Sequence, residues 1–171
     1  MLIRQATTKD IPAIQHLNRQ LDEHHVRLLP DIFQSVAGNA RPDSLIAEWI
    51  GDPDADYLLA EVEGEIVGFV NVRKSSHPDY PVFRPRHFAQ IGDAVVDGPK
   101  RGKGIGKELF EAATRWARER GVRFLQVTVW HENAGARAFY LEQGFRPMTM
   151  RMELDLERDS KDAHGSSEPS R

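Results

Sequence analysis

Apolar positions recur along this chain with two periods, which separate predicted strands from predicted helices. Short runs of aliphatic and β-branched residues predict strands, and apolar residues spaced three and four apart predict amphipathic helices. Ile11, Ile14 and Leu17 form such a helical face. The strands are predicted at 2–6, 57–62, 66–72, 88–96, 124–130 and 145–156, and the helices at about 9–27, 44–50, 105–120 and 134–143. The resulting order of elements is β-α-α-β-β-β-α-β-α-β.

Two segments lie outside this pattern. Residues 73–87 contain Pro78, Pro81 and Pro85, which predict a long loop rather than one regular element. Residues 156–171 are polar and charged, so we expect a disordered C-terminal tail. Residues 1–155 have the size of one domain, and we expect a single one.

A glycine-rich stretch, residues 101–107 (RGKGIGK), connects the predicted strand at 88–96 to the next helix. Such a turn leaves backbone N–H groups unshielded at the positive end of a helix, which favours an anion such as phosphate. Gly104 and Gly106 have no Cβ, so a ligand can approach the backbone closely. Arg101, Lys103 and Lys107 add positive charge. The stretch therefore predicts a ligand that carries phosphate.

Spacing separates three kinds of phosphate-binding loop. A P-loop needs four residues between its first glycine and Gly-Lys, followed by Ser or Thr, whereas here three residues intervene and Glu108 follows. A dinucleotide fingerprint needs G-x-G-x-x-G after the first strand, whereas these glycines read G-x-G-x-G beyond the middle of the chain. A nucleoside-triphosphate hydrolase is therefore disfavoured.

The pattern Arg101-x-x-Gly104-x-Gly106 resembles the R/Q-x-x-G-x-G/A loop of the GNAT superfamily of N-acetyltransferases. A second segment, Asn133 to Tyr140 followed by Gly144-Phe145, is similar to that family's N-x-x-A-x-x-F-Y-x-x-x-G-F pattern. The resemblance implies an α/β fold of the acyl-CoA N-acyltransferase type, with a mixed sheet flanked by helices. It also implies acetyl-CoA as cosubstrate, bound where the fourth and fifth strands separate.

The resemblance assigns cofactor contacts by position. The pantetheine arm pairs with the fourth strand, and the pyrophosphate lies on the glycine loop, as an added strand and an anion nest would. Asn133 is expected either to bind the cofactor or to cap its helix. The implied cofactor-binding residues are Val95, Val96, Asp97, Arg101, Gly102, Lys103, Gly104, Ile105, Gly106, Lys107, Asn133 and Tyr140.

The implied reaction is transfer of an acetyl group to a primary amine. It needs a base, a donor to the developing oxyanion and an acid for the leaving sulfur. The resemblance makes Tyr140 the acid, whereas the alternative role of Tyr140 is packing. Asp93, a carboxylate within an apolar strand, is the first candidate for the base, sharing a face with Ile91 and Val95 if the strand alternates strictly. His131 or water are alternatives, and His77 and His87 are weaker ones.

Composition narrows the remaining possibilities. The chain has 171 residues and no cysteine, which excludes a thiol intermediate and favours direct transfer in a ternary complex. A net charge of −3 argues against nucleic acid as a partner. His16, His24 and His25 lack the spacing of a metal site, so we expect no metal. No apolar run approaches a membrane span of about 20 residues, so we expect no membrane contact and a cytoplasmic protein.

The acceptor is expected opposite the cofactor, near residues 24–33 and 75–83, where acidic and basic residues mix. This mixture leaves open a small amine and a protein N-terminus or lysine. A homodimer through strand edges is a further expectation. The alternative function is a non-catalytic module that binds acyl-CoA as a sensor.

Overall fold

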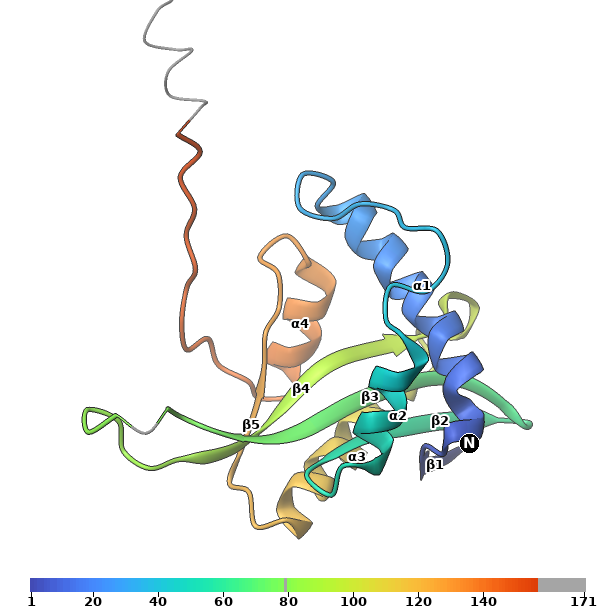
Figure 1. Ribbon diagram of the computed structural model, residues 1–171, viewed down its shortest axis with the longest axis horizontal. Helices are drawn as coiled ribbons and strands as arrows, with labels where there is room; N and C mark the ends of the chain where they lie inside the picture. Colours follow the sequence, from blue (N-terminus) through green and yellow to red (C-terminus); the bar gives the residue numbers. More distant parts are fainter. Residues whose placement is uncertain (79, 157–171) are drawn as a thin grey trace, which may run out of the picture. The chain divides into compact units, whose positions relative to one another are not determined.

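The computed structural model describes residues 1–78 and 80–156 (Figure 1). The chain divides into two compact units, Met1–Asn133 and Ala134–Arg171. The predicted single domain over residues 1–155 stays a prediction. The predicted disordered tail lies, apart from residue 156, outside the described residues.

The first unit is built around a five-stranded sheet in the order β1-β2-β3-β4-β5. Adjacent strands from β1 to β4 are antiparallel, and β4 pairs with β5 in parallel. The α/β fold with a mixed sheet is therefore as expected. The strands are β1 (Leu2–Gln5), β2 (Ala55–Val62), β3 (Glu65–Ser76), β4 (His87–Val96) and β5 (Phe124–Val127).

Helices cover both faces of this sheet (Figure 1). Helices α1 (Ile11–Leu28) and α2 (Asp43–Gly51) lie on one face, and α3 (Ile105–Glu119) lies on the other. A short 3₁₀ turn, Thr8–Asp10, precedes α1, and Thr7 and Asp10 close it with a reciprocal capping box. Pro12 falls in the first turn of α1, where its missing N–H costs little.

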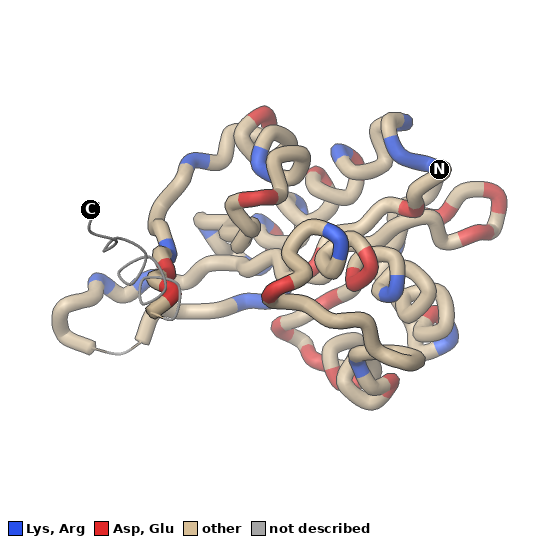
Figure 2. The backbone as a smooth tube through the Cα atoms, turned by 90° about the horizontal axis from the view of Figure 1, so that it is seen from above, with Lys and Arg blue, Asp and Glu red and all other residues tan. Residues whose placement is uncertain are grey.

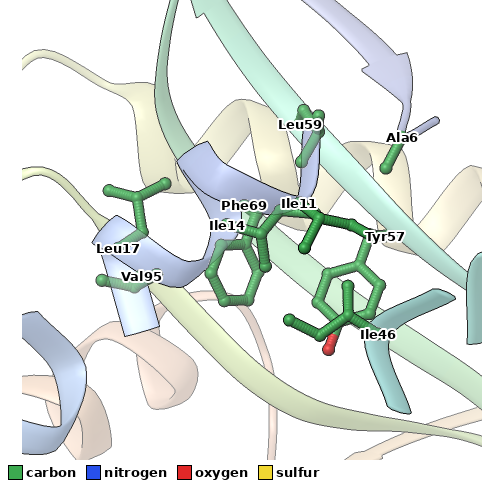
Figure 3. Close-up of a cluster of buried hydrophobic side chains, with 9 residues drawn as sticks. All are labelled: Ala6, Ile11, Ile14, Leu17, Ile46, Tyr57, Leu59, Phe69 and Val95. Atoms are coloured by element: carbon green, nitrogen blue, oxygen red, sulfur yellow. The ribbon is translucent and has the colours of Figure 1, made fainter. Parts of the chain in front are cut away.

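The core beneath α1 and α2 joins both helices to the centre of the sheet (Figure 3). Ile14 and Leu17 of α1 are fully buried, as is Phe69 of β3. Each fully buried side chain of this size contributes roughly 1.5–3 kcal/mol by leaving water. This burial fixes α1 over β3 and β4, which is the part of the sheet that carries the candidate site.

The predicted loop at 73–87 is shorter than expected. Residues 73–76 continue β3 and pair with the start of β4, so that Ser76 lies opposite His87. The two strands form an arm, and Pro78, Pro81 and Pro85 are confined to its tip, where no ladder N–H is needed. The prolines therefore mark a turn within a long hairpin rather than a loop of 15 residues.

In the second unit, α4 (Ala134–Glu142) forms as predicted. The Tyr140 ring contacts those of Phe139 and Phe145, with centroids 5.2 Å apart in each pair. The predicted strand at 145–156 is absent, because these described residues pair with no other strand. Their alternating apolar side chains remain exposed: Met148, Met150, Met152, Leu154 and Leu156.

Candidate active site

Strands β4 and β5 separate partway along their length. Their parallel pairing runs from Phe88 with Phe124 to Ile91 with Val127 and ends there. β4 continues to Val96, so its residues 92–96 have no partner on the β5 side among the described residues. An unpaired strand edge presents backbone donors and acceptors to an extended ligand. This is the separation that the sequence resemblance implied.

A β-bulge explains why the pairing stops at Ile91. Val70 pairs with Ala94 and Val72 with Ile91, so two β4 residues, Gly92 and Asp93, lie opposite Asn71 alone. Bulges bend a strand and terminate pairing at its other edge. The separation of β4 from β5 therefore begins at the residue where β4 bulges.

The Asn71 side chain holds this bulge together. Its Oδ1 accepts hydrogen bonds from the backbone N–H groups of Gly92 (3.1 Å) and Asp93 (2.8 Å). Its Nδ2 donates to Oδ2 of Asp93 at 3.4 Å. A Cβ on residue 92 would collide with Oδ1 of Asn71, so any larger residue there would displace the Asn71 side chain from its hydrogen bonds. Sequence reasoning did not single out Asn71, although a glycine inside a strand pattern is a recognised sign of a bulge.

Because of the bulge, the Asp93 side chain shares a face with only one of the two residues that the sequence predicted. Residues directly opposite in antiparallel strands share a face, so Ile91 lies with Val72, and Val95 lies with Phe69 on the α1 face. Ile91 and Val95 therefore point to opposite faces. Strict alternation predicted that Asp93 shares a face with Ile91 and with Val95. The prediction is wrong for Ile91, because the extra residue of the bulge shifts the alternation of side chains.

Asp93 lies in a network of charged side chains on the α1 face. Arg41, from the segment between α1 and α2, donates from Nη1 to both carboxylate oxygens of Asp22, at 2.9 and 3.0 Å. Its Nη2 lies 3.5 Å from Oδ2 of Asp93. Burial by itself lowers the pKa of Arg41, but the Asp93 and Asp22 carboxylates outweigh this effect and raise it. Arg41 thus links the segment above the sheet to α1 and to β4.

The glycine loop leads from β4 through a 3₁₀ turn, Gly98–Lys100, into α3. Gly102 and Gly104 have φ angles of 75° and 80°, in the left-handed region that favours glycine, and Gly104 is the N-cap of α3. In the described part of the chain, the amides of residues 102–106 donate to no carbonyl. These amides form a row of donors at a helix N-terminus, which suits a phosphate group.

Positive charge at this loop is local. Lys and Arg residues are interspersed with Asp and Glu along the whole described backbone (Figure 2). Lys103 and Lys107 are exposed at the loop. Arg101 is also exposed, and its Nε donates to the carbonyl of Val96 at 3.0 Å. The loop therefore gathers cationic side chains beside the unused amides.

Gln20 of α1 connects this region to the helix above. Its Nε2 donates to Oδ1 of Asp97 at 2.8 Å, and its Oε1 accepts from the Gly98 N–H at 3.2 Å. Both ends of one side-chain amide are thus bonded to the start of the glycine loop. Among the predicted cofactor residues, Val95, Val96, Asp97 and residues 101–107 form one continuous path from the open β4 edge to the N-terminus of α3.

Aromatic rings extend from α1 to the end of β5. The His25 ring stacks on Phe33, with centroids 5.0 Å apart and 20° between the planes. Phe33 in turn meets Trp130 edge-on, with centroids 5.4 Å apart. Because Trp130 follows β5, these rings cross from the helix to the strand that separates from β4. Sequence reasoning considered the His25 side chain as a metal ligand and included it in the expected acceptor region, residues 24–33.

The other candidate catalytic and cofactor-binding residues lie outside the β4 edge and the glycine loop. Asn133 directly precedes α4, and its backbone N–H donates to the Trp130 carbonyl at 3.0 Å. His131 is exposed in the turn after β5. His77 packs between the rings of Phe83 and Phe88, and His87 is exposed at the base of the arm. Tyr140 belongs to the second unit, so its role as the acid stays a prediction.

Comparison with known proteins agrees with this geometry. Residues 20–145 match the model of the Acetyltransferase (GNAT) family. The chain therefore belongs to this family. None of the helices in the described ranges 1–78 and 80–156 is long and apolar enough to cross a membrane.

Individual relatives resemble the chain to different extents. The crystal structure of a mutant of the BH1408 protein from Bacillus halodurans superposes with a TM-score of 0.86 at 30% identity, covering 91% of this chain and 99% of that one. The aminoalkylphosphonate N-acetyltransferase of Salmonella typhimurium is 26% identical over 84% of each chain.

An uncharacterised N-acetyltransferase from Methanocaldococcus jannaschii is 35% identical over 57% of this chain, but the match spans only 42% of that relative's length. A second, from Archaeoglobus fulgidus, is 33% identical over 58% of this chain and 66% of its own length.

Proposed function

We propose that this protein transfers the acetyl group of acetyl-CoA to a primary amine, directly and within a ternary complex. The observation that carries the proposal is the open edge of β4 at residues 92–96, which ends at the glycine loop. An extended arm that pairs with this edge brings its phosphate end to the amides of residues 102–106. Coenzyme A has this form, with a pantetheine arm joined to a pyrophosphate.

The cofactor contacts follow from this path. The backbone of Val95, Val96 and Asp97 pairs with the pantetheine arm. Within the stretch from Arg101 to Lys107, the unused N–H groups of residues 102–106 surround the pyrophosphate, and the loop's cationic side chains add positive charge. Asn133 contributes a hydrogen bond to the cofactor or caps α4.

The transfer itself makes one bond and breaks another. The nitrogen lone pair of the amine attacks the thioester carbonyl carbon, a C–N bond forms, and the C–S bond breaks with its electron pair going to sulfur. The nitrogen loses one proton and the sulfur gains one, so the products are an amide and free CoA. Tyr140 is the proposed acid for sulfur, and the Asp93 carboxylate is proposed to assist removal of the proton from the amine.

The names of relatives indicate which classes of amine the proposal includes. A named relative acts on aminoalkylphosphonates, and another carries the name putative ribosomal protein bS18-alanine N-acetyltransferase. A small-molecule amine and a protein N-terminus or lysine are therefore both included in the proposal. A homodimer, also included, would sediment at twice the 19.4 kDa mass of the chain.

The experiment that tests this function measures release of free CoA thiol from acetyl-CoA across a panel of amines. The panel contains aminoalkylphosphonates, aminoglycosides, polyamines, amino acids, and peptides with a free N-terminus or lysine. Thiol release that depends on one class of amine, with a matching mass gain of the acceptor, supports the proposal. Binding of acetyl-CoA without turnover on any amine would replace it with the sensor function.

A further inference from the structure

His25 lies close to the separation of β4 and β5, although it belongs to α1. Its ring is the first in the series His25, Phe33 and Trp130, which ends just beyond β5. Phe33 fixes the plane of the imidazole by stacking at 20°. Among the described residues, no hydrogen bond engages either ring nitrogen. His25 therefore combines a fixed ring orientation with nitrogens that remain available to a ligand.

The charged groups that face His25 come from three segments. Asp22 and His24 lie on its own helix, Asp93 comes from β4, and Arg41 comes from the segment after α1. Burial lowers the pKa of His25, and His24 lowers it further, whereas the Asp93 and Asp22 carboxylates partly oppose this change. The lowered pKa favours the uncharged imidazole, which is the form that can accept a proton.

Asp93 is less suited than His25 to receive a proton. Its Oδ2 already lies near the Arg41 guanidinium and accepts from the Asn71 amide. Because this oxygen is already engaged by a cation and an amide donor, the Asp93 carboxylate is better suited to balance a nearby positive charge than to accept a proton. In a His–carboxylate pair, the carboxylate stabilises the imidazolium and the imidazole moves the proton.

We propose that His25 is the general base of the acetyl transfer and that Asp93 balances the charge of its imidazolium. The proposal rests on the proposed function, because it names the residue that serves the same reaction. As the C–N bond forms, the proton on the amine nitrogen passes to a ring nitrogen of His25. The C–S electron pair leaves with sulfur, which takes a proton from the proposed acid. The imidazolium then returns its proton to solvent and the acid takes one up, so that the enzyme is restored.

The neighbouring His24 does not fit this role. Burial lowers its pKa, and the cationic side chains of Arg101 and Arg27 lower it further. Within residues 1–78 and 80–156, no carboxylate counters these effects on His24 as Asp93 and Asp22 do on His25, so a proton on His24 would lack a counter-charge. His24 and His25 thus differ in their suitability as a base because His24 is near cationic side chains, whereas His25 is near two carboxylates.

The test uses the full-length protein and the best amine from the thiol-release panel. His25→Phe retains a ring that can stack on Phe33 but has no proton acceptor, and His25→Ala leaves space for added imidazole. We expect both to lower kcat by about 10²–10⁴, the usual contribution of a general base, with unchanged affinity for acetyl-CoA. Arg19→Gln, at an exposed position on the same helix, is the control and should retain the wild-type rate.

Two further readouts separate catalysis from structure. Imidazole should restore turnover to His25→Ala in proportion to its free-base concentration, but not to His25→Phe. The acid limb of the kcat profile should move to lower pH in Asp93→Asn, because loss of the carboxylate lowers the pKa of His25.

The outcomes distinguish the two proposals. If wild-type protein releases no thiol with any amine, the proposed function fails. If wild-type protein is active but His25→Phe retains more than a third of its kcat, or imidazole does not restore His25→Ala, the assignment of His25 is wrong.

Discussion

Replacing Asn71 by alanine should destabilise the bulge in β4. The change leaves the backbone N–H groups of Gly92 and Asp93 without their shared acceptor, Oδ1 of Asn71. Each hydrogen bond contributes a net of roughly 0.5–1.5 kcal/mol, so two predict a loss of about 1–3 kcal/mol in the free energy of unfolding. Urea unfolding followed by tryptophan fluorescence measures this loss, and for a chain of this size Tm should fall by about 2–4 °C per kcal/mol.

A double-mutant cycle makes this prediction specific to the bulge. Gly92→Ala places a Cβ against Oδ1 of Asn71, and this collision disappears when residue 71 is alanine. The two losses should therefore sum to more than the loss in the double variant, with a coupling of about 0.5–3 kcal/mol. Losses that add within about 0.5 kcal/mol would refute the idea that Asn71 holds the bulge. Each single variant should also bind acetyl-CoA more weakly, because the shape of the open β4 edge depends on the bulge.

Three other predictions test separate parts of the molecule. Gly104→Val should weaken acetyl-CoA binding measured by calorimetry, because valine is strained at a φ of 80° and its side chain covers the loop amides; unchanged affinity would exclude the loop as the pyrophosphate site. Tyr140→Phe should lower kcat and leave acetyl-CoA affinity unchanged, whereas an equal loss of both would mean that the hydroxyl binds rather than donates. Hydrogen bonds from Arg4 hold the pKa of Asp10 well below its usual range, so their stabilisation is present above about pH 4 and is lost as the pH falls. Asp10→Asn should therefore show a shallower loss of unfolding free energy below pH 4 than the wild type, and identical slopes would contradict this.

The features that were predictable from the sequence are local ones. The glycine loop could be placed because Gly102 and Gly104 adopt a backbone conformation that few other residues tolerate. The turn at Glu63 and Gly64 between β2 and β3 follows from the same preference, since both have positive φ. Helix α1 followed from the spacing of Ile14 and Leu17, which are fully buried. In each of these cases, a few residues close together in the sequence are enough to predict the local structure.

The features that were missed depend on contacts between distant segments. Asn71 bonds to residues 21 and 22 positions away, and Arg41 meets Asp93 across an even longer interval. Nothing in the alternation of β4 records how these side chains are paired, so the orientation of Asp93 was only partly right. The segment at 145–156 shows the reverse case, because it has the alternation of a strand but no partner strand in the described structure. A strand requires a neighbour, and periodicity alone does not supply one.

The two hydrogen bonds of the Gln20 amide restrict which part of α1 can change without disturbing the cofactor loop. One amide joins the middle of α1 to Asp97 and Gly98, so the helix cannot slide along its axis without losing contact with the cofactor loop. In the described structure, the last two turns of α1 and the segment up to Arg41 make no side-chain hydrogen bond to the cofactor loop. Changes in acceptor preference can therefore accumulate there while the cofactor site keeps its geometry. Gln20 therefore separates the part of α1 that is bonded to the cofactor loop from the part whose side chains, apart from His25, can vary with the amine.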